Sequence, residues 1–280
     1  MAGTDKGWGK VCIASRREKQ VMSEFTEHFD LMLATGIRRG DSYSICSGRP
    51  AHWAANELVE RFLQSECDSI LWVDSDAKIE GDTLAKLRDL EEGWEYDILS
   101  AFYCRRGWPP EAIWMQRMPD GNYRNVAVLQ EVTLPVDAVG LHFCLMRRRV
   151  FETLPGPDWF YYPRRKPWAR VAGTENQWRE LIDGDPGLVL WDKSMVEHRK
   201  SEDVAFCEEA LAAGFKLGST SKVTTGHYST IPTGWETHHE WLKANQLVEK
   251  FGIDPDGRPL DPDAYAAANG LNGHKETEAV

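Results

Sequence analysis

Residues 69–87, SILWVDSDAKIEGDTLAKL, decide the fold because they join a buried strand to a helix through two aspartates. Residues 70–73 form a continuous apolar run, which is typical of a strand covered on both faces of its sheet. The following segment, residues 82–90, has leucines at helical spacing and an aspartate at its start. Asp74 and Asp76 therefore stand at the carboxyl end of a strand, which is where ligands bind in open α/β sheets.

The segments around this unit repeat the alternation of strand and helix. Residues 11–14 predict a first strand followed by a polar turn at residues 15–17, and residues 51–65 predict a helix with two neighbouring apolar stripes. Residues 98–103 predict the next strand. Strand, helix, strand, helix, strand is the order of a parallel α/β sheet. Further elements are expected at residues 44–47, 126–136, 141–146, 147–154, 189–191, 201–213, 216–218 and 223–225.

The composition narrows the class of protein. The chain has 280 residues, a formal net charge of −11 and a pI of about 5.3, which argues against a broad electrostatic footprint on nucleic acid or anionic membrane. No apolar run approaches the ~18–20 residues of a membrane-spanning helix, and the first residues lack the apolar region of a signal peptide. The six cysteines include no C-x-x-C pair, so we expect reduced, packed thiols in a cytoplasmic protein.

Asp74 and Asp76 pose an electrostatic problem, because two carboxylates one residue apart repel and each resists ionising without a nearby cation. Mg²⁺ and Mn²⁺ take oxygen ligands, often one or two carboxylates together with substrate phosphates. The pair therefore indicates a divalent-metal site that holds a diphosphate. The alternative is a polar turn whose acidic residues are stabilised by the dipole of the following helix.

Two later motifs add candidate groups for the same site. In HRKSEDVAFCEEALAAGF, Glu202 and Asp203 open a predicted helix, although they could equally be ordinary acidic residues of a first helical turn. In VTTGHYS, His227 ends a predicted strand, and imidazole is a ligand for metals that include Mn²⁺. A single histidine is more often structural or solvated than a metal ligand. The interpretation of His227 as a ligand is therefore supported only in combination with the two aspartates.

In this order, the apolar strand with DSD, the SEDV helix start and the GHY segment resemble the GT-A glycosyltransferases, and within them the family-2-like enzymes of bacteria and their phages. The resemblance covers roughly residues 11–227 and is strongest in ANELVERFLQSECDSILWVDSDAKIEGDTLAKL, DAVGLHFCLMRRRVFETL and SEDVAFCEEALAAGFKLG. It implies a single α/β domain of the GT-A, Rossmann-like type. Its mixed, mostly parallel central sheet would be flanked by helices, with a small β-rich region on the acceptor side.

The resemblance also implies roles for individual residues. Asp74, Asp76 and His227 would bind Mn²⁺ or Mg²⁺ that bridges the two phosphates of a nucleotide-sugar, with a UDP-sugar favoured. Asp203, beside Glu202, would act as the general base on the acceptor hydroxyl in an inverting transfer. The residues expected around the nucleotide and its phosphates are Ala14, Ser15, Arg16, Arg49, Asp74, Ser75 and Arg105.

Two segments depart from the family pattern. Members commonly have a proline at the end of the first strand, where this chain has CIASRRE. The glycine-rich approach to the acceptor site is reduced to DAVGLHF, in which Gly140 and His142 stand where contacts with the donor sugar are expected.

The expected organisation is one glycosyltransferase domain over residues 1–252 and a flexible acidic tail over residues 253–280. The domain would consist of a nucleotide-binding half near residues 8–106 and an acceptor half near residues 107–252. The partners would be a nucleotide-sugar donor and an acceptor that is a glycan, a protein or a modified nucleic-acid base. The expected location is the cytoplasm of a bacterium or of a phage-infected cell.

Two other classes of protein are compatible with these motifs. A nucleotidyltransferase that forms nucleotide-sugars also combines an α/β sheet with metal-binding acids, but it usually has a glycine-rich basic loop after the first strand, and ASRREKQ has no glycine. A carbohydrate-binding or phage protein without catalytic activity could share the fold. The presence of Asp74, Asp76 and Asp203 together favours an enzyme.

Overall fold

The computed structural model describes residues 7–17, 21–106, 110–118, 123–128, 130–162, 168–171, 178–180, 188–189, 201–228 and 238. The helices are α1 (Ser23–Gly36), α2 (Ala51–Leu63), α3 (Thr83–Asp89), α4 (Arg148–Thr153) and α5 (Glu202–Ala212), with a short 3₁₀ helix η1 (Glu91–Glu95). The strands are β1 (Val11–Arg17), β2 (Ser42–Ser47), β3 (Ser69–Asp74), β4 (Ala77–Lys78), β5 (Ile98–Phe102), β6 (Trp114–Arg117), β7 (Tyr123–Asn125), β8 (Thr133–Pro135), β9 (Ala138–Val139), β10 (Phe143–Arg147), β11 (Trp168–Val171), β12 (Trp178–Glu180), β13 (Leu188–Val189), β14 (Leu217–Thr224) and β15 (Gly226–His227).

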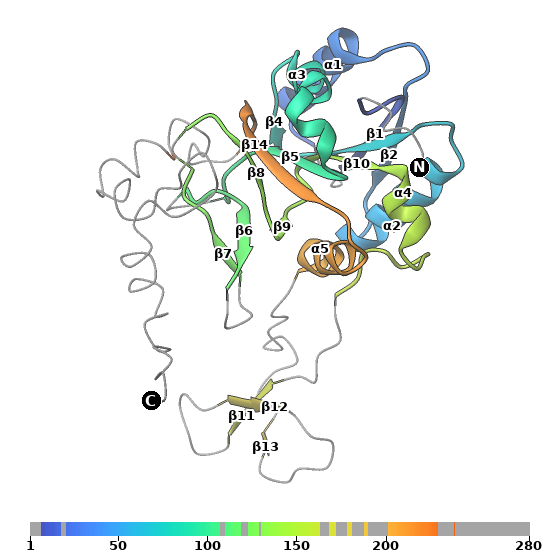
Figure 1. Ribbon diagram of the computed structural model, residues 1–280. Coiled ribbons are helices and arrows are strands. Elements are labelled where there is room, and N and C mark those ends of the chain that lie inside the picture. Colours follow the sequence, from blue (N-terminus) through green and yellow to red (C-terminus); the bar gives the residue numbers. More distant parts are fainter. Residues whose placement is uncertain are drawn as a thin grey trace.

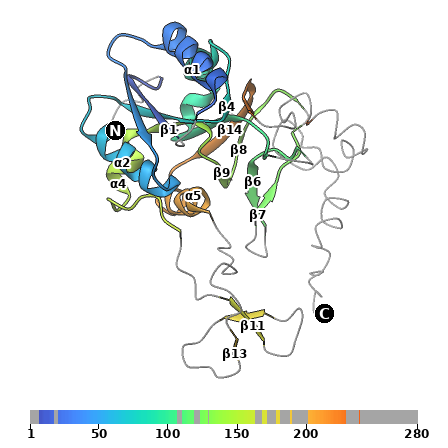
Figure 2. The same cartoon turned by 180° about the vertical axis from the view of Figure 1, so that it is seen from behind.

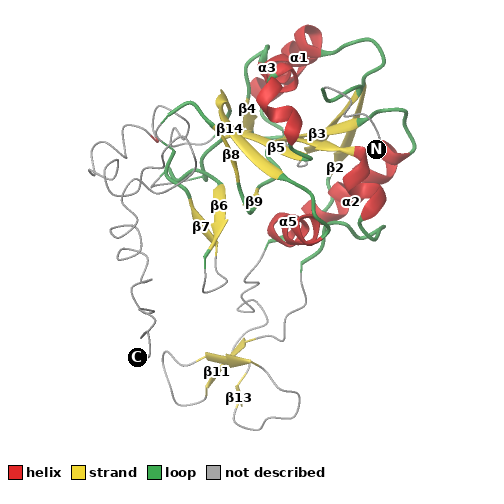
Figure 3. Ribbon diagram, in the orientation of Figure 1, coloured by secondary structure: helices red, strands yellow, loops and turns green. Residues whose placement is uncertain are grey.

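A seven-stranded sheet with the order β2-β1-β3-β10-β5-β14-β8 forms the centre of the molecule (Figures 1 and 3). β1 pairs in parallel with β2 and β3, and β14 pairs in parallel with β5. β10 runs antiparallel between β3 and β5, and β8 runs antiparallel at the edge. The predicted fold class is therefore confirmed: this is an α/β protein with a mixed, mostly parallel central sheet flanked by helices.

Helices cover both faces of this sheet, as the two opposite views show (Figures 1 and 2). On one face α1 and α3 pack against alternate strand residues such as Ile13 and Leu71, and on the other α2, α4 and α5 pack against Ala14 and Trp72. Because side chains alternate along a strand, both sets of strand residues are buried. The central strands therefore form a rigid support for the polar residues at their ends.

Smaller sheets extend this support towards the end of β3. β15 pairs antiparallel with β4, and His227 stands opposite Ala77, the residue after Asp76. β6, β7 and β9 form a three-stranded sheet, which is the small β-rich region expected beside the main sheet. β11, β12 and β13 form another three-stranded sheet.

Several element boundaries differ from the prediction. β1 does not turn at residues 15–17, because Arg16 and Arg17 continue the pairing with β2. The two short strands expected at residues 216–218 and 223–225 are one strand, β14, with a register shift along its pairing with β5. Helix α1 has no counterpart among the predicted elements. No helix in the described part of the chain is long and apolar enough to cross a membrane, and the tail predicted at residues 253–280 lies outside the described residues.

Candidate functional site

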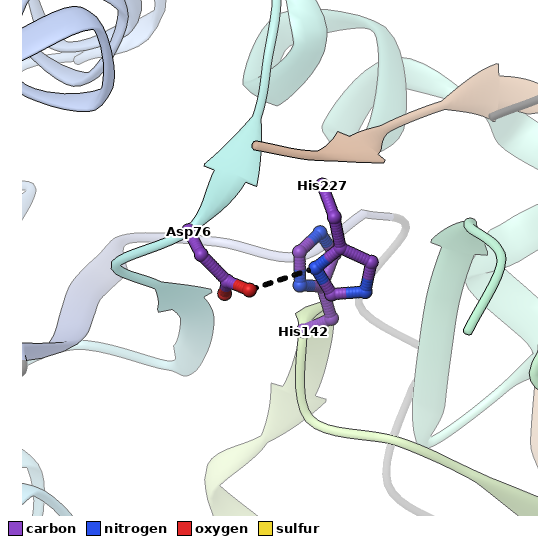
Figure 4. A group of neighbouring side chains, drawn as sticks. All are labelled: Asp76, His142 and His227. Atoms are coloured by element: carbon purple, nitrogen blue, oxygen red, sulfur yellow. Dashed lines mark hydrogen bonds and ion pairs between the residues drawn. The ribbon is translucent and has the colours of Figure 1, made fainter. Parts of the chain in front are cut away.

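Asp76, His142 and His227 form a compact cluster of possible metal ligands at the end of β3 (Figure 4). One ligand atom from each side chain lies within 4.8 Å of the other two. His227 Nδ1 is 3.0 Å from Asp76 Oδ2, and the centres of the two imidazole rings are 4.1 Å apart. Three side chains from distant parts of the sequence can therefore contact one ion.

The backbone pairings explain why these residues meet. The backbone N–H of Tyr228 donates to the carbonyl of Asp76 at 2.8 Å, which continues the ladder between β4 and β15 and fixes His227. The N–H of Asp74 donates to the carbonyl of His142 at 3.0 Å, which continues the ladder between β3 and β10. Since β10 runs antiparallel to β3, the residue that precedes β10 lies beside the end of β3.

The hydrogen bonds of His142 leave one nitrogen suited to a metal. Its Nε2 is 2.9 Å from the carbonyl oxygen of Gly226, which can only accept, so Nε2 carries the proton. Its Nδ1 is buried and has no hydrogen-bond partner among the described residues. Burial, followed by the neighbouring His227 ring, lowers the pKa of His142 to about 3. The imidazole is therefore neutral near pH 7, which is the state that binds a metal.

Asp76 supplies the negative charge of the cluster. Burial alone would raise its pKa, but the hydrogen bond to His227 and the nearby His142, His227 and Arg106 lower the pKa of this carboxyl to about 2. Arg106 forms an ion pair with Asp76, and its own side chain is exposed. Asp76 is therefore ionised at neutral pH and available as an oxygen ligand.

The donor set indicates which ions fit. One carboxylate oxygen and two imidazole nitrogens suit first-row transition-metal ions, a class that includes Mn²⁺, whereas Mg²⁺ prefers oxygen ligands and retains water. The unpartnered Nδ1 of His142 is a further sign of fit, because a buried polar atom without a partner costs free energy unless a ligand compensates it. Of the two predicted ions, the cluster favours Mn²⁺ over Mg²⁺.

Asp74, predicted as a metal ligand, is not a member of this cluster. Arg16 Nε donates to Asp74 Oδ1 at 2.9 Å, and Arg16 Nη1 lies 3.8 Å from Glu202 Oε1. Burial raises the pKa of Asp74, and the Arg16 guanidinium opposes that shift only in part. Arg16 thus neutralises two of the predicted acidic residues and joins the end of β3 to the start of α5.

A cavity of about 230 Å³ opens beside the cluster. Its walls include residues 74–76 and four arginines, which are Arg16, Arg17, Arg49 and Arg106. Since Asp74 and Asp76 are the acidic residues in this lining, the positive charges outnumber the negative ones. Guanidinium groups recognise phosphate through several donors at once, so the cavity suits a phosphorylated ligand.

Asp203 is held at the start of α5. The backbone N–H of Val204 donates to Asp203 Oδ1 at 2.9 Å, and the Ser201 hydroxyl donates to the same oxygen. Burial is the main cause that raises the pKa of Asp203, and the neighbouring Glu202 adds to it. A carboxylate with a raised pKa is a stronger base than an exposed aspartate, and it can still be ionised at neutral pH.

The other predicted nucleotide contacts differ in their surroundings. Ala14 and Ser15 are fully buried, so their side chains do not face the cavity. Arg49 lines the cavity while pairing with Glu57 at 2.9 Å. Arg105 pairs with Glu111 at 3.2 Å, and it is the next residue, Arg106, that lines the cavity.

Sequence reasoning placed His142 near the donor sugar but not among the metal ligands, and of the neighbouring pair Arg105 and Arg106 it selected Arg105 for the nucleotide site. His142 lies in the segment DAVGLHF. Its place beside Asp76 depends on the position of β10 between β3 and β5, and no local sequence pattern predicts that strand order. Arg106 follows β5 by four residues, so its closeness to the end of β3 also depends on strand order. His238 is buried, and its Nδ1 contacts the carbonyl of Pro110 at 2.6 Å.

No family model matches the chain, and no curated protein matches its sequence. Solved structures do resemble it. A197 from STIV aligns with a TM-score of 0.46 at 16% identity, over 79% of this chain and 86% of that chain. GalNAc-T7, in a crystal structure with UDP, GalNAc and Mn²⁺, aligns with a TM-score of 0.47 at 8% identity, over 80% of this chain and 44% of that chain. Both similarities are too distant to assign an activity.

Proposed function

We propose that the protein is a metal-dependent glycosyltransferase that moves a sugar from a nucleoside-diphosphate sugar, with UDP as the favoured nucleotide, to an acceptor hydroxyl. The observation that carries the proposal is the Asp76, His142 and His227 cluster beside a cavity lined by four arginines, with Asp203 close by. A diphosphate in the cavity would place its negative charge against Arg16, Arg17, Arg49 and Arg106.

The position of Asp203 relative to the cluster supports its proposed role. Tyr103 stacks on His142 with ring centres 4.5 Å apart. A Cβ atom built on Gly140 would meet both the Tyr103 hydroxyl, at 1.8 Å, and Asp203 Oδ2, at 3.3 Å. Asp203 and the cluster are therefore neighbours across Tyr103.

In this mechanism the protein groups bind the donor and accept a proton. Asp76, His142 and His227 would hold the divalent ion, which as a Lewis acid neutralises charge on the leaving diphosphate. Arg106 and Arg49 would contact the phosphates. Asp203 would accept the proton of the acceptor hydroxyl as the new glycosidic bond forms, and attack from the face opposite the leaving group inverts the anomeric centre.

The proposed roles of these residues divide the domain into a nucleotide-binding half and an acceptor half. Residues 8–106, which supply β1, β3 and all four cavity arginines, would form the nucleotide-binding half. Residues 107–252, which include Asp203 and His227, would form the acceptor half. The acceptor class stays open between a glycan, a protein and a modified nucleic-acid base.

Incubation with Mn²⁺ and a panel of UDP-sugars tests the proposal, with release of UDP as the readout. Asp203→Asn should leave donor affinity, measured by calorimetry, unchanged while removing most of the transfer rate, by about 10²–10⁴-fold for a general base. Glu209→Gln, on the same helix and outside the site, is the matched control. Loss of donor affinity in Asp203→Asn would overturn the assignment of the base, and release of pyrophosphate would instead indicate a nucleotidyltransferase.

A further inference from the structure

Tyr103 connects the metal cluster to Asp203 and belongs to none of the sequence motifs that predicted the site. It follows the last residue of β5 and is 5% exposed. Its ring stacks on His142 with an interplanar angle of 26°, and its edge contact with His227 has ring centres 5.7 Å apart. One side chain thus touches both histidines of the cluster.

The orientation of His142 depends on few contacts. Its Nε2 is fixed by the carbonyl of Gly226, while its Nδ1 has no partner among the described residues. The flat ring of Tyr103 packs against the His142 ring with centres 4.5 Å apart and restricts its rotation. One nitrogen of His142 lies within 4.8 Å of a ligand atom of Asp76 and of His227.

The hydroxyl of Tyr103 occupies the space over Gly140. A Cβ atom there would lie 1.8 Å from the hydroxyl oxygen, so position 140 accepts only glycine while Tyr103 keeps its place. The same Cβ would be 3.3 Å from Asp203 Oδ2, which shows that the hydroxyl and the carboxylate share one small region.

We propose that Tyr103 is a positioning residue whose ring and hydroxyl have separate roles. The ring orients the His142 imidazole towards the bound ion, and the hydroxyl orients the Asp203 carboxylate. This inference rests on the proposed function, because it presumes that the cluster binds a divalent ion. Outer residues that orient metal ligands typically change metal affinity or activity by about 10–100-fold when they are replaced.

Two substitutions separate the two parts. Tyr103→Phe keeps the ring and removes the hydroxyl, so Mn²⁺ affinity should be unchanged while UDP release falls by about 10–100-fold. Tyr103→Leu removes the flat ring, so Mn²⁺ affinity itself should fall by about 10–100-fold. Affinity is measured by calorimetry with MnCl₂ alone, and far-UV circular dichroism verifies that each variant is folded. Tyr43→Leu, at an exposed position of β2, is the matched control.

Gly140 provides an independent test through a double-mutant cycle. Gly140→Ala should lower Mn²⁺ affinity, because its Cβ displaces the Tyr103 hydroxyl and with it the ring that stacks on His142. Combining Gly140→Ala with Tyr103→Phe removes the atom that clashes, so part of the affinity should return. If the double variant bound Mn²⁺ as weakly as Gly140→Ala alone, the proposed route from Gly140 through Tyr103 to His142 would be overturned.

The outcomes distinguish this inference from the proposed function. If the wild-type protein does not bind Mn²⁺, the proposed function fails. If the wild-type protein binds Mn²⁺ and folded Tyr103→Leu binds it equally well, the role of the ring is refuted while the metal site stands. If Tyr103→Phe retains the full rate of UDP release, the role of the hydroxyl is refuted.

Discussion

Asn56 tests how buried hydrogen bonds stabilise the elements that carry the site. It lies on α2 and is almost fully buried. Its Nδ2 donates to the carbonyl of Phe160 at 2.9 Å, and the N–H of Phe160 donates to its Oδ1 at 2.9 Å. The Phe160 ring in turn contacts Phe206 of α5, with ring centres 4.4 Å apart, and Trp72 of β3, at 5.4 Å. The Asn56 carboxamide therefore fixes residue 160 on α2, and the Phe160 ring contacts the elements that carry Asp74 and Asp203.

The expected cost of Asn56→Ala follows from these two hydrogen bonds. The substitution leaves one backbone N–H and one backbone carbonyl buried without partners, and each unsatisfied group costs about 1–3 kcal/mol. The free energy of unfolding should therefore fall by about 2–6 kcal/mol. Entry of water to both groups would place the loss at the lower end of this range.

Urea denaturation at 25 °C, followed by circular dichroism, measures this loss. Asn125→Ala is the control, because Asn125 is exposed and its side chain donates to Glu111 at 3.3 Å on the surface. A surface substitution of this kind should change stability by no more than about 0.5 kcal/mol. If Asn56→Ala lowered the free energy of unfolding no more than Asn125→Ala does, the paired hydrogen bonds would not hold residue 160 in solution and the reasoning would be refuted.

Three further predictions concern the metal, the core and the base. Mn²⁺ at about 100 times its dissociation constant should raise the free energy of unfolding by about 2.7 kcal/mol in thermal denaturation, and His142→Ala should reduce that gain; equal protection of both proteins would exclude His142 as a ligand. Arg148→Ala should lower stability by about 2–4 kcal/mol in urea denaturation, because Arg148 donates to the carbonyls of Phe62, Leu63, Ser65 and Cys67 after α2, and Arg148→Lys should recover only part of this loss. The transfer rate at saturating Mn²⁺ and donor should rise with pH as Asp203 ionises, with its midpoint above 3.8 because burial raises the pKa of that carboxyl; a rate that falls with rising pH would contradict its role as a base.

Local patterns were sufficient to predict the central α/β alternation. The apolar run before Asp74 became β3, and the helix expected at residues 51–65 is α2, from Ala51 to Leu63. These predictions succeeded because buried parallel strands and amphipathic helices leave a periodic record in the sequence. Helix α1 has a similar periodic pattern in Phe25, Phe29 and Met32, which are buried on one face, although the sequence analysis predicts no element there.

The composition of the site could be predicted only in part, because it depends on how distant segments pair. Asp76 and His227 lie together as expected, with a hydrogen bond of 3.0 Å between them. Asp74 stands in the same sequence context as Asp76, yet its carboxylate accepts from Arg16 instead of joining the cluster. That difference depends on the position of Arg16 in β1 opposite Asp74, which is a matter of strand register.

The reversed direction of β10 has a consequence for how this chain can vary. His142 reaches the cluster from the start of its strand, whereas Asp76 reaches it from beyond the end of β3, so the two approach the same edge from opposite chain directions. A one-residue insertion within β10 would turn alternate side chains to the other face and exchange the imidazole for an apolar neighbour. We therefore expect length changes to be tolerated in surface loops, while the spacing between residue 142 and the strand that follows it stays fixed.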